Sequence, residues 1–136
     1  MKPLGPIPPG YTAIDGELAI AGRKASDLVA EAGDTPLFVY SRELVTRRVA
    51  DLRAAMPPRL ALHYAVKANP YGPLLTMMAG LVDGFDIASG GELTMVRAAG
   101  IDPARVSFAG PGKRDAELAA AIAAGVTLNL ESEGEF

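Results

Sequence analysis

Short runs of strand-forming residues recur along most of this chain, and their spacing constrains the fold more than any other feature. The runs end roughly twenty to twenty-two residues apart. A stripe of apolar residues with helical period fills each gap, and Gly100 and Gly125 end two of these helices. Short strands alternating with helices predict right-handed crossovers and a parallel sheet. The predicted strands are 60–66, 81–87, 105–110 and 126–130.

Four such strand–helix units predict half of an eight-stranded barrel. We therefore expect an α/β protein of the (β/α)8 type, truncated after about four βα units, with residues 57–136 as the first half of the barrel. Residues 15–56 should lead into it through strands at 17–20 and 37–40, each followed by a helix. Residues 1–14 carry four prolines and are predicted to form a disordered lead-in rich in proline and glycine.

Composition excludes several classes of function. The 136 residues include no cysteine and one histidine, which argues against a disulfide framework, a thiolate nucleophile and a metal cluster. The formal charge of −3 comes without a basic stripe, so no nucleic-acid partner is expected. No run of about 18 apolar residues and no apolar signal core occurs. We therefore expect no membrane partner and a soluble, cytoplasmic protein.

Lys67 stands at the end of the most strand-like run, LALHYAV, just before the turn at Asn69 and Pro70. Both faces of that run are mostly apolar, as in a parallel strand covered by helices. An ammonium group beside apolar side chains loses hydration, which favours the free amine, and a free amine is the nucleophile that forms imines. A lysine that only extends its charge into water is the other interpretation of this stretch taken alone.

Catalytic groups of a β/α barrel lie at the carboxyl ends of its strands. That rule gathers Lys67, Asp86 and the glycine-rich turn 110–112 at one end of the predicted barrel. The backbone N–H groups of residues 89–92, where a helix begins, are expected to receive an anion. A carboxylate at Asp86 is expected to keep a lysine imine protonated.

Each of these residues also has a purely structural interpretation. Asp86 can accept hydrogen bonds from loop amides at a strand end, and Glu92 with Ser89 spells a helix capping box. His63 is expected on a helix-covered face of its strand, outside the site. Lys113 is expected to be a solvated residue at the start of a helix.

Four motifs, in this order and spacing, carry a resemblance to a known family: YAVKAN (64–69), GFDIASGGEL (84–93), FAGPGK (108–113) and LNLESEGE (128–135). They resemble the N-terminal barrel half of the fold-type III pyridoxal-phosphate-dependent decarboxylases, which act on ornithine, lysine, arginine or diaminopimelate. The diaminopimelate branch is the most similar. The resemblance covers about residues 15–136 and implies a barrel of the alanine racemase type.

By this resemblance, Lys67 is the catalytic residue that forms an imine with the cofactor, pyridoxal 5′-phosphate, and Asp86 and Glu92 are cofactor-binding acids. The implied enzyme is a carboxy-lyase with a small amino-acid substrate, converting meso-diaminopimelate to lysine in lysine biosynthesis, and it works as a homodimer. A related decarboxylase with another amino-acid substrate, a non-catalytic pyridoxal-phosphate carrier and an alanine racemase-like enzyme are the alternatives.

Sequence resembling the family's phosphate-binding glycine loop and ring-stacking histidine is missing from these 136 residues. Ser132 and Glu135 spell a capping box whose helix is cut off at Phe136, so we expect an N-terminal piece of a longer protein. Large apolar side chains on the inward faces are expected to pack on barrel strands that the piece lacks; these are Leu62, Tyr64, Phe85, Phe108 and Leu128. By itself the chain should therefore be marginally folded and inactive.

Overall fold

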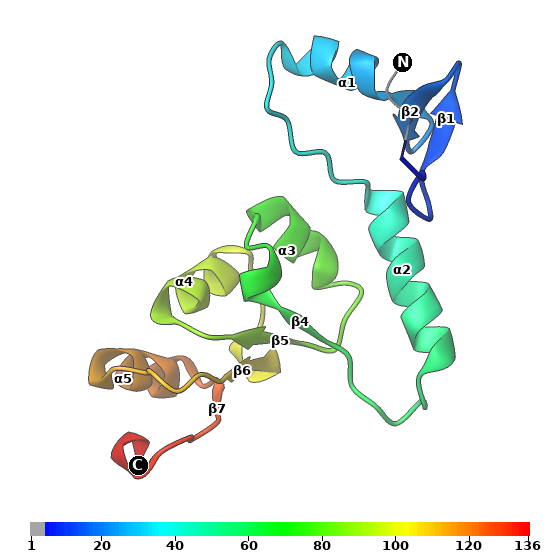
Figure 1. The fold of residues 1–136 in the computed structure, drawn as a ribbon. Helices are drawn as coiled ribbons and strands as arrows, with labels where there is room; N and C mark the ends of the chain where they lie inside the picture. Colours follow the sequence, from blue (N-terminus) through cyan, green and yellow to red (C-terminus); the bar gives the residue numbers. More distant parts are fainter. Residues whose placement is uncertain (1–4) are drawn as a thin grey trace. The chain divides into compact units, whose positions relative to one another are not determined.

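A computed structural model describes residues 5–136 (Figure 1). The first four residues of the predicted lead-in lie outside the described part of the chain. The chain forms two compact units, Met1–Leu52 and Arg53–Phe136. The second unit holds all the residues that the sequence assigns to the site.

The first unit is built on a three-stranded antiparallel sheet in the order β1-β2-β3. Both connections, Asp15-Gly16 and Ala21-Gly22, have positive φ at each residue, between 50° and 77°. Two-residue turns of this kind match the twist of paired strands. The disordered lead-in predicted through residue 14 is therefore wrong for Thr12–Ile14, because the Asp15-Gly16 turn pairs this segment with the next strand. The strands are β1 (Thr12–Ile14), β2 (Glu17–Ile20) and β3 (Arg23–Lys24).

Two helices follow this sheet in the chain. The first, α1 (Ala25–Ala32), ends at Gly33, whose φ of 85° is the left-handed conformation of a helix C-cap. The second, α2 (Arg42–Ala55), is the helix predicted to follow residues 37–40. The Ser41 Oγ accepts the N–H of Leu44 at 3.2 Å, so one of the unpaired amides at this helix start is satisfied.

The strand predicted at residues 37–40 does not form. The segment has no regular structure, and the side chain of Phe38 is 81% exposed. The preference of branched and aromatic residues for strands depends on packing against neighbouring strands. No other strand pairs with residues 37–40 in the described chain, so the local preference alone does not make a strand here.

The second unit holds a four-stranded parallel sheet in the order β4-β5-β6-β7, and a helix follows each of its first three strands. The predicted alternation of strands and helices is confirmed, although each strand is shorter than predicted. The elements are β4 (His63–Ala65), α3 (Gly72–Met78), β5 (Gly84–Ile87), α4 (Gly90–Ala98), β6 (Val106–Phe108), α5 (Asp115–Ala124) and β7 (Thr127–Leu128). Three 3-10 turns accompany them: η1 (Val66–Ala68), η2 (Pro103–Arg105) and η3 (Glu133–Glu135).

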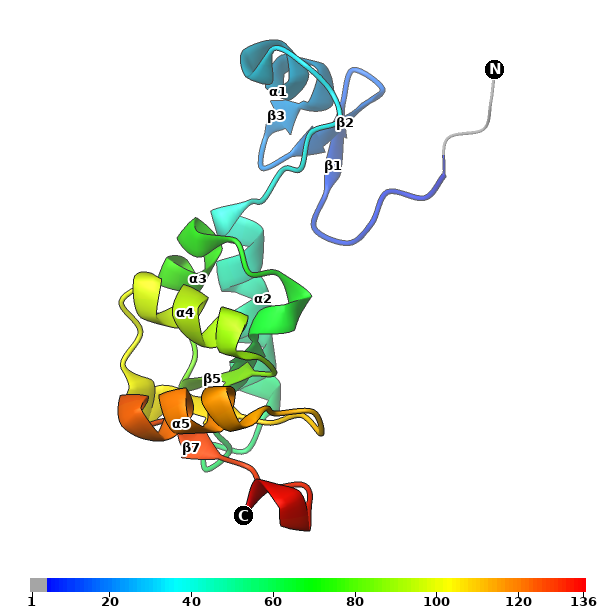
Figure 2. The same ribbon diagram turned by 90° about the vertical axis from the view of Figure 1, so that its left-hand side faces the viewer.

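The two faces of this sheet differ in character. Helices α3, α4 and α5 lie side by side over one face (Figure 2). Phe85 and Phe108 are fully buried and belong to this helix-covered face. Asp86 and Ser107 alternate with them and lie on the open face, partly exposed. The expectation that the two phenylalanines face absent strands is therefore wrong. Strand alternation separates two faces without saying which of them the helices cover.

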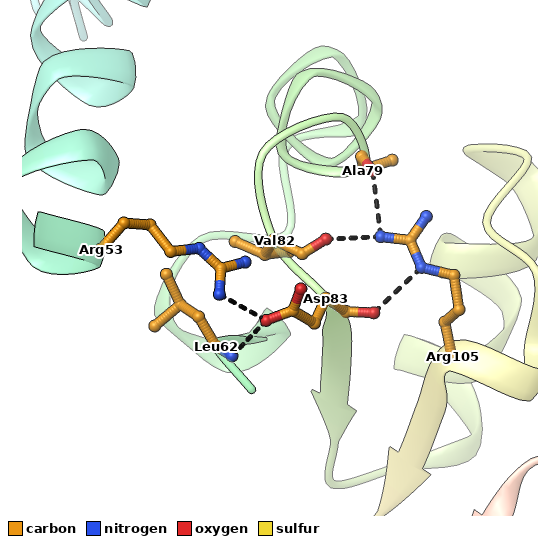
Figure 3. Close-up of polar contacts among 6 residues, drawn as sticks. All are labelled: Arg53, Leu62, Ala79, Val82, Asp83 and Arg105. Carbon is orange, nitrogen blue, oxygen red and sulfur yellow. Dashed lines mark hydrogen bonds and ion pairs between the residues drawn. The ribbon is translucent and has the colours of Figure 1, made fainter. Parts of the chain in front are cut away.

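Arg105, at the end of η2, binds the backbone that leads into β5 (Figure 3). Its Nη2 donates to the carbonyl oxygens of Ala79 and Val82, at 3.0 and 2.6 Å. Its Nε donates to the carbonyl oxygen of Asp83 at 3.0 Å. The last carbonyls of a helix have no donor within the helix, and here the forked guanidinium supplies donors to the chain leaving α3.

The carboxylate of Asp83 joins the starts of β4 and β5 in the same region (Figure 3). Its Oδ2 accepts the N–H of Leu62 and lies 2.6 Å from both that nitrogen and Nη1 of Arg53. The Arg53 guanidinium and the Leu62 amide lower the pKa of Asp83 from 3.8 to about 2. These contacts lie at the amino ends of the strands, where conserved geometry in β/α barrels serves stability and not catalysis.

Candidate active site

The carboxyl ends of the parallel strands open into one cavity of about 400 Å³. Lys67 reaches it from the turn after β4, Asp86 from β5 and Gly110 from the loop after β6. The structure therefore brings together the three positions that the barrel rule gathered from sequence. Pro111 and Glu131 also line the cavity, whereas Glu92 and Gly112 are not among its lining residues.

The turn that carries Lys67 is held by neighbouring side chains. Tyr64 Oη donates to the carbonyl oxygen of Asn69 at 3.0 Å, across η1. The Asn69 Oδ1 in turn accepts the N–H of Tyr71 at 3.1 Å, which is the geometry of an Asx turn. Lys67 itself is exposed in the described structure, so the burial among apolar side chains that we expected is absent. Its amine is instead accessible to a ligand in the cavity.

Asp86 is placed by the register of the sheet. Ala65, Asp86 and Ser107 occupy matching positions on three adjacent strands, so Asp86 stands in the middle of the open face. Its Oδ1 accepts a hydrogen bond from the Ser107 hydroxyl and lies 3.2 Å from Nδ1 of His63. Two groups on neighbouring strands therefore orient this carboxylate toward the cavity edge.

His63 does not lie on the helix-covered face where the sequence analysis put it. Its ring covers Gly84 on the open face, and a Cβ built at Gly84 would lie 2.6 Å from a ring carbon. Only glycine leaves room for the imidazole at this position, which explains the glycine at the start of β5. The side chain is 37% exposed and belongs to the Asp86 cluster.

Glu92 has the position of a helix-capping residue. The Ser89 Oγ accepts the N–H of Glu92 at 3.2 Å, and Glu92 Oε2 accepts the N–H of Ala88 at 2.8 Å. The N–H of Gly90 donates to Glu117 Oε1 at 2.7 Å. Two of the amides that we expected to receive an anion therefore already bind protein oxygens, and the role of Glu92 toward a cofactor stays a prediction.

Glu131 is a cavity residue that the sequence analysis missed. It follows β7, and its Oε1 accepts the N–H of Gly110 at 2.8 Å. Gly110 has a φ of 126°, a conformation that other residues rarely adopt, so glycine is required in this loop. The signal for Glu131 was present in the sequence, because an acid directly after a predicted barrel strand is by position a site residue.

Lys113 also differs from expectation. The sequence predicted a solvated lysine at the start of a helix, but the side chain is 1% exposed. Its Nζ lies 3.0 Å from Glu135 Oε2. Long-range pairing between the loop after β6 and the turn η3 explains the difference, since a buried ammonium group requires a partner that local sequence does not reveal.

The described residues, 5–136, contain no group of three or more His, Cys, Asp or Glu side chains arranged to bind a metal ion. None of their helices combines the length and the apolar character needed to cross a membrane.

Comparison with protein families gave one match over most of the chain. Residues 42–136 match the family described as pyridoxal-dependent decarboxylase, pyridoxal binding domain. Curated diaminopimelate decarboxylases are similar in sequence. The protein of Aquifex aeolicus is 42% identical over 123 residues, which is 90% of this chain and 29% of the relative. That of Neisseria meningitidis serogroup B is 45% identical over 112 residues, covering 79% of this chain and 27% of the relative.

Solved structures agree with the sequence relatives. A crystal structure from Aquifex aeolicus superposes with a TM-score of 0.84 at 40% identity and covers 93% of this chain and 32% of that one. The diaminopimelate decarboxylase of M. jannaschii, in co-complex with L-lysine, gives a TM-score of 0.78 at 27% identity, over 93% of this chain and 31% of that one. The described chain thus matches the N-terminal part of such a barrel domain, which confirms the predicted fold. It spans less than a third of these relatives.

Proposed function

The chain belongs to the pyridoxal-dependent decarboxylase family, and from this premise we propose that Lys67 and Asp86 form part of the cofactor site of an amino-acid decarboxylase. The observation that carries the proposal is the shared cavity: an accessible lysine amine and an oriented carboxylate meet at the carboxyl ends of adjacent parallel strands. This is the end of a β/α barrel where catalytic groups lie.

The residues present fit pyridoxal 5′-phosphate. The cofactor attaches to proteins through a lysine amine, and Lys67 is an exposed lysine that lines a cavity of about 400 Å³. Cofactor sites in proteins span about 300–1,000 Å³. Lys67 Nζ would hold the aldehyde carbon of the cofactor covalently. When bound, pyridoxal phosphate supplies an electron sink for the electrons released as a carboxylate leaves an amino acid.

Asp86 provides fixed negative charge in the cavity that Lys67 also lines. The Ser107 hydroxyl donates to its Oδ1, and His63 lies on the same oxygen, so the carboxylate cannot rotate freely. A carboxylate held in this position favours a proton on a nearby nitrogen. Asp86 would therefore help to keep a proton on Lys67 Nζ when that atom holds the cofactor.

The proposed substrate is meso-diaminopimelate, with lysine as product. The support comes from relatives that are 42–45% identical and carry the name diaminopimelate decarboxylase. A decarboxylase for another amino acid is the second candidate. An ornithine decarboxylase from Entamoeba histolytica gives a TM-score of 0.72 at 26% identity. We propose that the whole protein acts as a homodimer, as the resemblance to the family implies.

Chemical trapping tests the role of Lys67. In the full-length protein loaded with pyridoxal phosphate, borohydride reduction should fix the cofactor on Lys67, and peptide mass spectrometry should find no label at Lys24 or Lys113. Lys67→Ala should abolish labelling and lysine formation from meso-diaminopimelate, because no other amine lines the cavity within the described residues. Lys24→Ala is the matched control.

Two outcomes would contradict the proposal in different ways. Label at another lysine would remove Lys67 from the site. Label at Lys67 without release of carbon dioxide from diaminopimelate, ornithine, lysine or arginine would favour a non-catalytic carrier of pyridoxal phosphate over a decarboxylase.

A further inference from the structure

The side chain of Lys113 is 1% exposed, and the proposed chemistry gives this buried ammonium group no role. Its Nζ donates to the carbonyl oxygen of Gly110 at 2.5 Å and lies 3.0 Å from Glu135 Oε2. The ammonium group also lies 5.9 Å from the centre of the Phe108 ring, within the range of a cation–π contact. A buried ammonium group with this set of partners is held in a single place.

The partners of Lys113 complete a closed ring of contacts, which runs through Lys113, Gly110, Glu131 and Glu135. Glu135 Oε2 accepts the N–H of Glu131 at 2.8 Å as well as pairing with the lysine. Glu131 Oε1 accepts the N–H of Gly110, and the Gly110 carbonyl accepts from Lys113. Both backbone polar groups of Gly110 are therefore fixed, one by each side of the ring.

The ring joins two loops that approach from different strands. Gly110 follows β6 and Glu131 follows β7, and both line the cavity that holds Lys67. Lys113 and Glu135 do not line it. The side chain of Glu135 is 5% exposed, and the Glu131 amide together with the Lys113 ammonium lowers the pKa of Glu135. The buried Glu135 carboxylate therefore stays ionised at neutral pH.

We propose that Lys113 and Glu135 are positioning residues that hold the Gly110 loop and the Glu131 carboxylate at the rim of the Lys67 cavity. The effect on the reaction rests on the proposed function, whereas the effect on the two loops does not. Without the ammonium group, the Gly110 carbonyl and Glu135 lose a common partner, and the buried carboxylate is left without its counter-charge. The loop should then open and Glu131 should leave the rim.

The loop between β5 and α4 provides a comparison with this ring of contacts. There, Glu92 and Glu117 accept amides of Ala88 and Gly90 without any buried cation. The acid after β7 instead depends on Lys113 through two intermediates, Gly110 and Glu135. A substitution at Lys113 should therefore disturb the amides of Gly110 and Glu131, and leave those of Ala88 and Gly90 in place.

Amide hydrogen exchange with peptide resolution tests the positioning claim in the full-length protein loaded with pyridoxal phosphate. Lys113→Met keeps the length of the side chain and removes its charge. We expect exchange at Gly110 and Glu131 to rise by about tenfold, with Ala88 and Gly90 unchanged. Glu135→Gln, which keeps an acceptor for the Glu131 amide, should raise exchange at Gly110 more than at Glu131. Lys24→Met is the control for loss of a lysine outside the ring.

Kinetics of the same variants test the consequence for the site. Misplacing groups at a reaction centre lowers rates by up to about a hundredfold. We expect Lys113→Met to lower kcat with little change in KM, and labelling of Lys67 by borohydride to persist. Unchanged exchange at Gly110 and Glu131 in a folded Lys113→Met protein would overturn the proposal. If that variant does not fold, unchanged exchange at Gly110 in Glu135→Gln overturns it, and a local increase there supports it. Absence of label at Lys67 in the unsubstituted protein would instead refute the proposed function, while the exchange experiment still decides the role of Lys113.

Discussion

After Lys67, the proposed chemistry depends most on the charge of the Asp86 carboxylate. In the full-length protein loaded with pyridoxal phosphate, Asp86→Asn should lower the pH midpoint of the cofactor's spectral titration, because an amide does not stabilise a proton on the neighbouring nitrogen. It should also reduce kcat more than it reduces cofactor retention. Absorbance spectra recorded against pH, with steady-state assays, provide the measurement.

Glu92→Gln is the matched control for this substitution. Glutamine keeps an oxygen that can accept the N–H of Ala88, so a residue with only a capping role tolerates the change. An unchanged titration in Asp86→Asn would leave Asp86 with the structural role of receiving the Ser107 hydroxyl. A large loss of activity in Glu92→Gln would show that this residue does more than cap α4.

The sequence predicts the candidate residues that stand directly at strand ends and line the cavity, but not those that reach the candidate site through pairing. Lys67 and Asp86 follow from strand position, because the barrel rule needs only the order of elements. His63 and Ser107 meet Asp86 through cross-strand register, which depends on pairings that one sequence does not specify. Lys113 was assigned to solvent because its partner lies twenty-two residues further along the chain, in η3.

The fully buried Phe85 lies on the face of β5 that the helices cover, whereas the sequence predicted that it faces absent barrel strands. In the chain, Phe85→Ala should lower the free energy of unfolding by about 3–5 kcal/mol, because the ring packs beneath the helices and leaves a cavity when removed. Ile122→Ala, at a site 68% exposed on α5, should change it by less than about 0.5 kcal/mol. Urea denaturation at low protein concentration provides the comparison, and similar small effects from both variants would contradict the helix-covered face.

Two carboxylates link neighbouring elements and predict how the unit responds to acid. Arg53 and the Leu62 amide lower the pKa of Asp83 to about 2, and the Gly90 amide and Arg114 do the same for Glu117. A group whose pKa is lower in the folded state than in the unfolded chain stabilises the folded state at pH values above its unfolded pKa. The ordinary pKa values are 3.8 for Asp83 and 4.5 for Glu117. The stabilisation is therefore lost as the pH falls from 4.5 toward 2.

Urea midpoints measured at several pH values test this. The midpoint should fall steeply between pH 4.5 and 2, and Glu117→Gln should make the fall shallower because one of the two linked groups no longer titrates. Glu133→Gln removes an exposed carboxyl of η3 and serves as the control. Equal slopes in the two variants would mean that the Glu117 contacts do not contribute.

The elements predicted best were those with helical or strand periodicity and a clear stop signal. The predicted helix end at Gly125 was correct because a left-handed glycine ends a helix through local backbone geometry. The strand at residues 37–40 failed because its partner strand does not exist in the described chain. The lead-in was ordered at Thr12–Ile14 because a two-residue turn with positive φ outweighs the neighbouring prolines.

For the whole molecule, the open edges of the sheet are the feature that distinguishes this chain from a closed barrel. In the described sheet, β4 and β7 each pair with a neighbour on one side alone. Closing a barrel joins such edges, and an edge left open presents unpaired N–H and C=O groups to another chain. The open face is less apolar than we expected from sequence, because Asp86, Ser107 and His63 lie on it and the buried rings of Phe85 and Phe108 do not.

We therefore expect the 136-residue chain to associate through its edge strands, with a sedimentation coefficient that rises with concentration. Thr127→Lys places a charge on the edge strand β7 and should reduce this association. Ala123→Lys adds the same charge at an exposed position of α5, outside the edge strand itself, and should not. The chain alone should release no carbon dioxide from meso-diaminopimelate, because it spans 27–29% of the length of the first curated relatives. A chain that stays monomeric at every concentration would contradict the role of the edges. A chain that forms lysine by itself would contradict the division of the reaction between this part and the rest of such an enzyme.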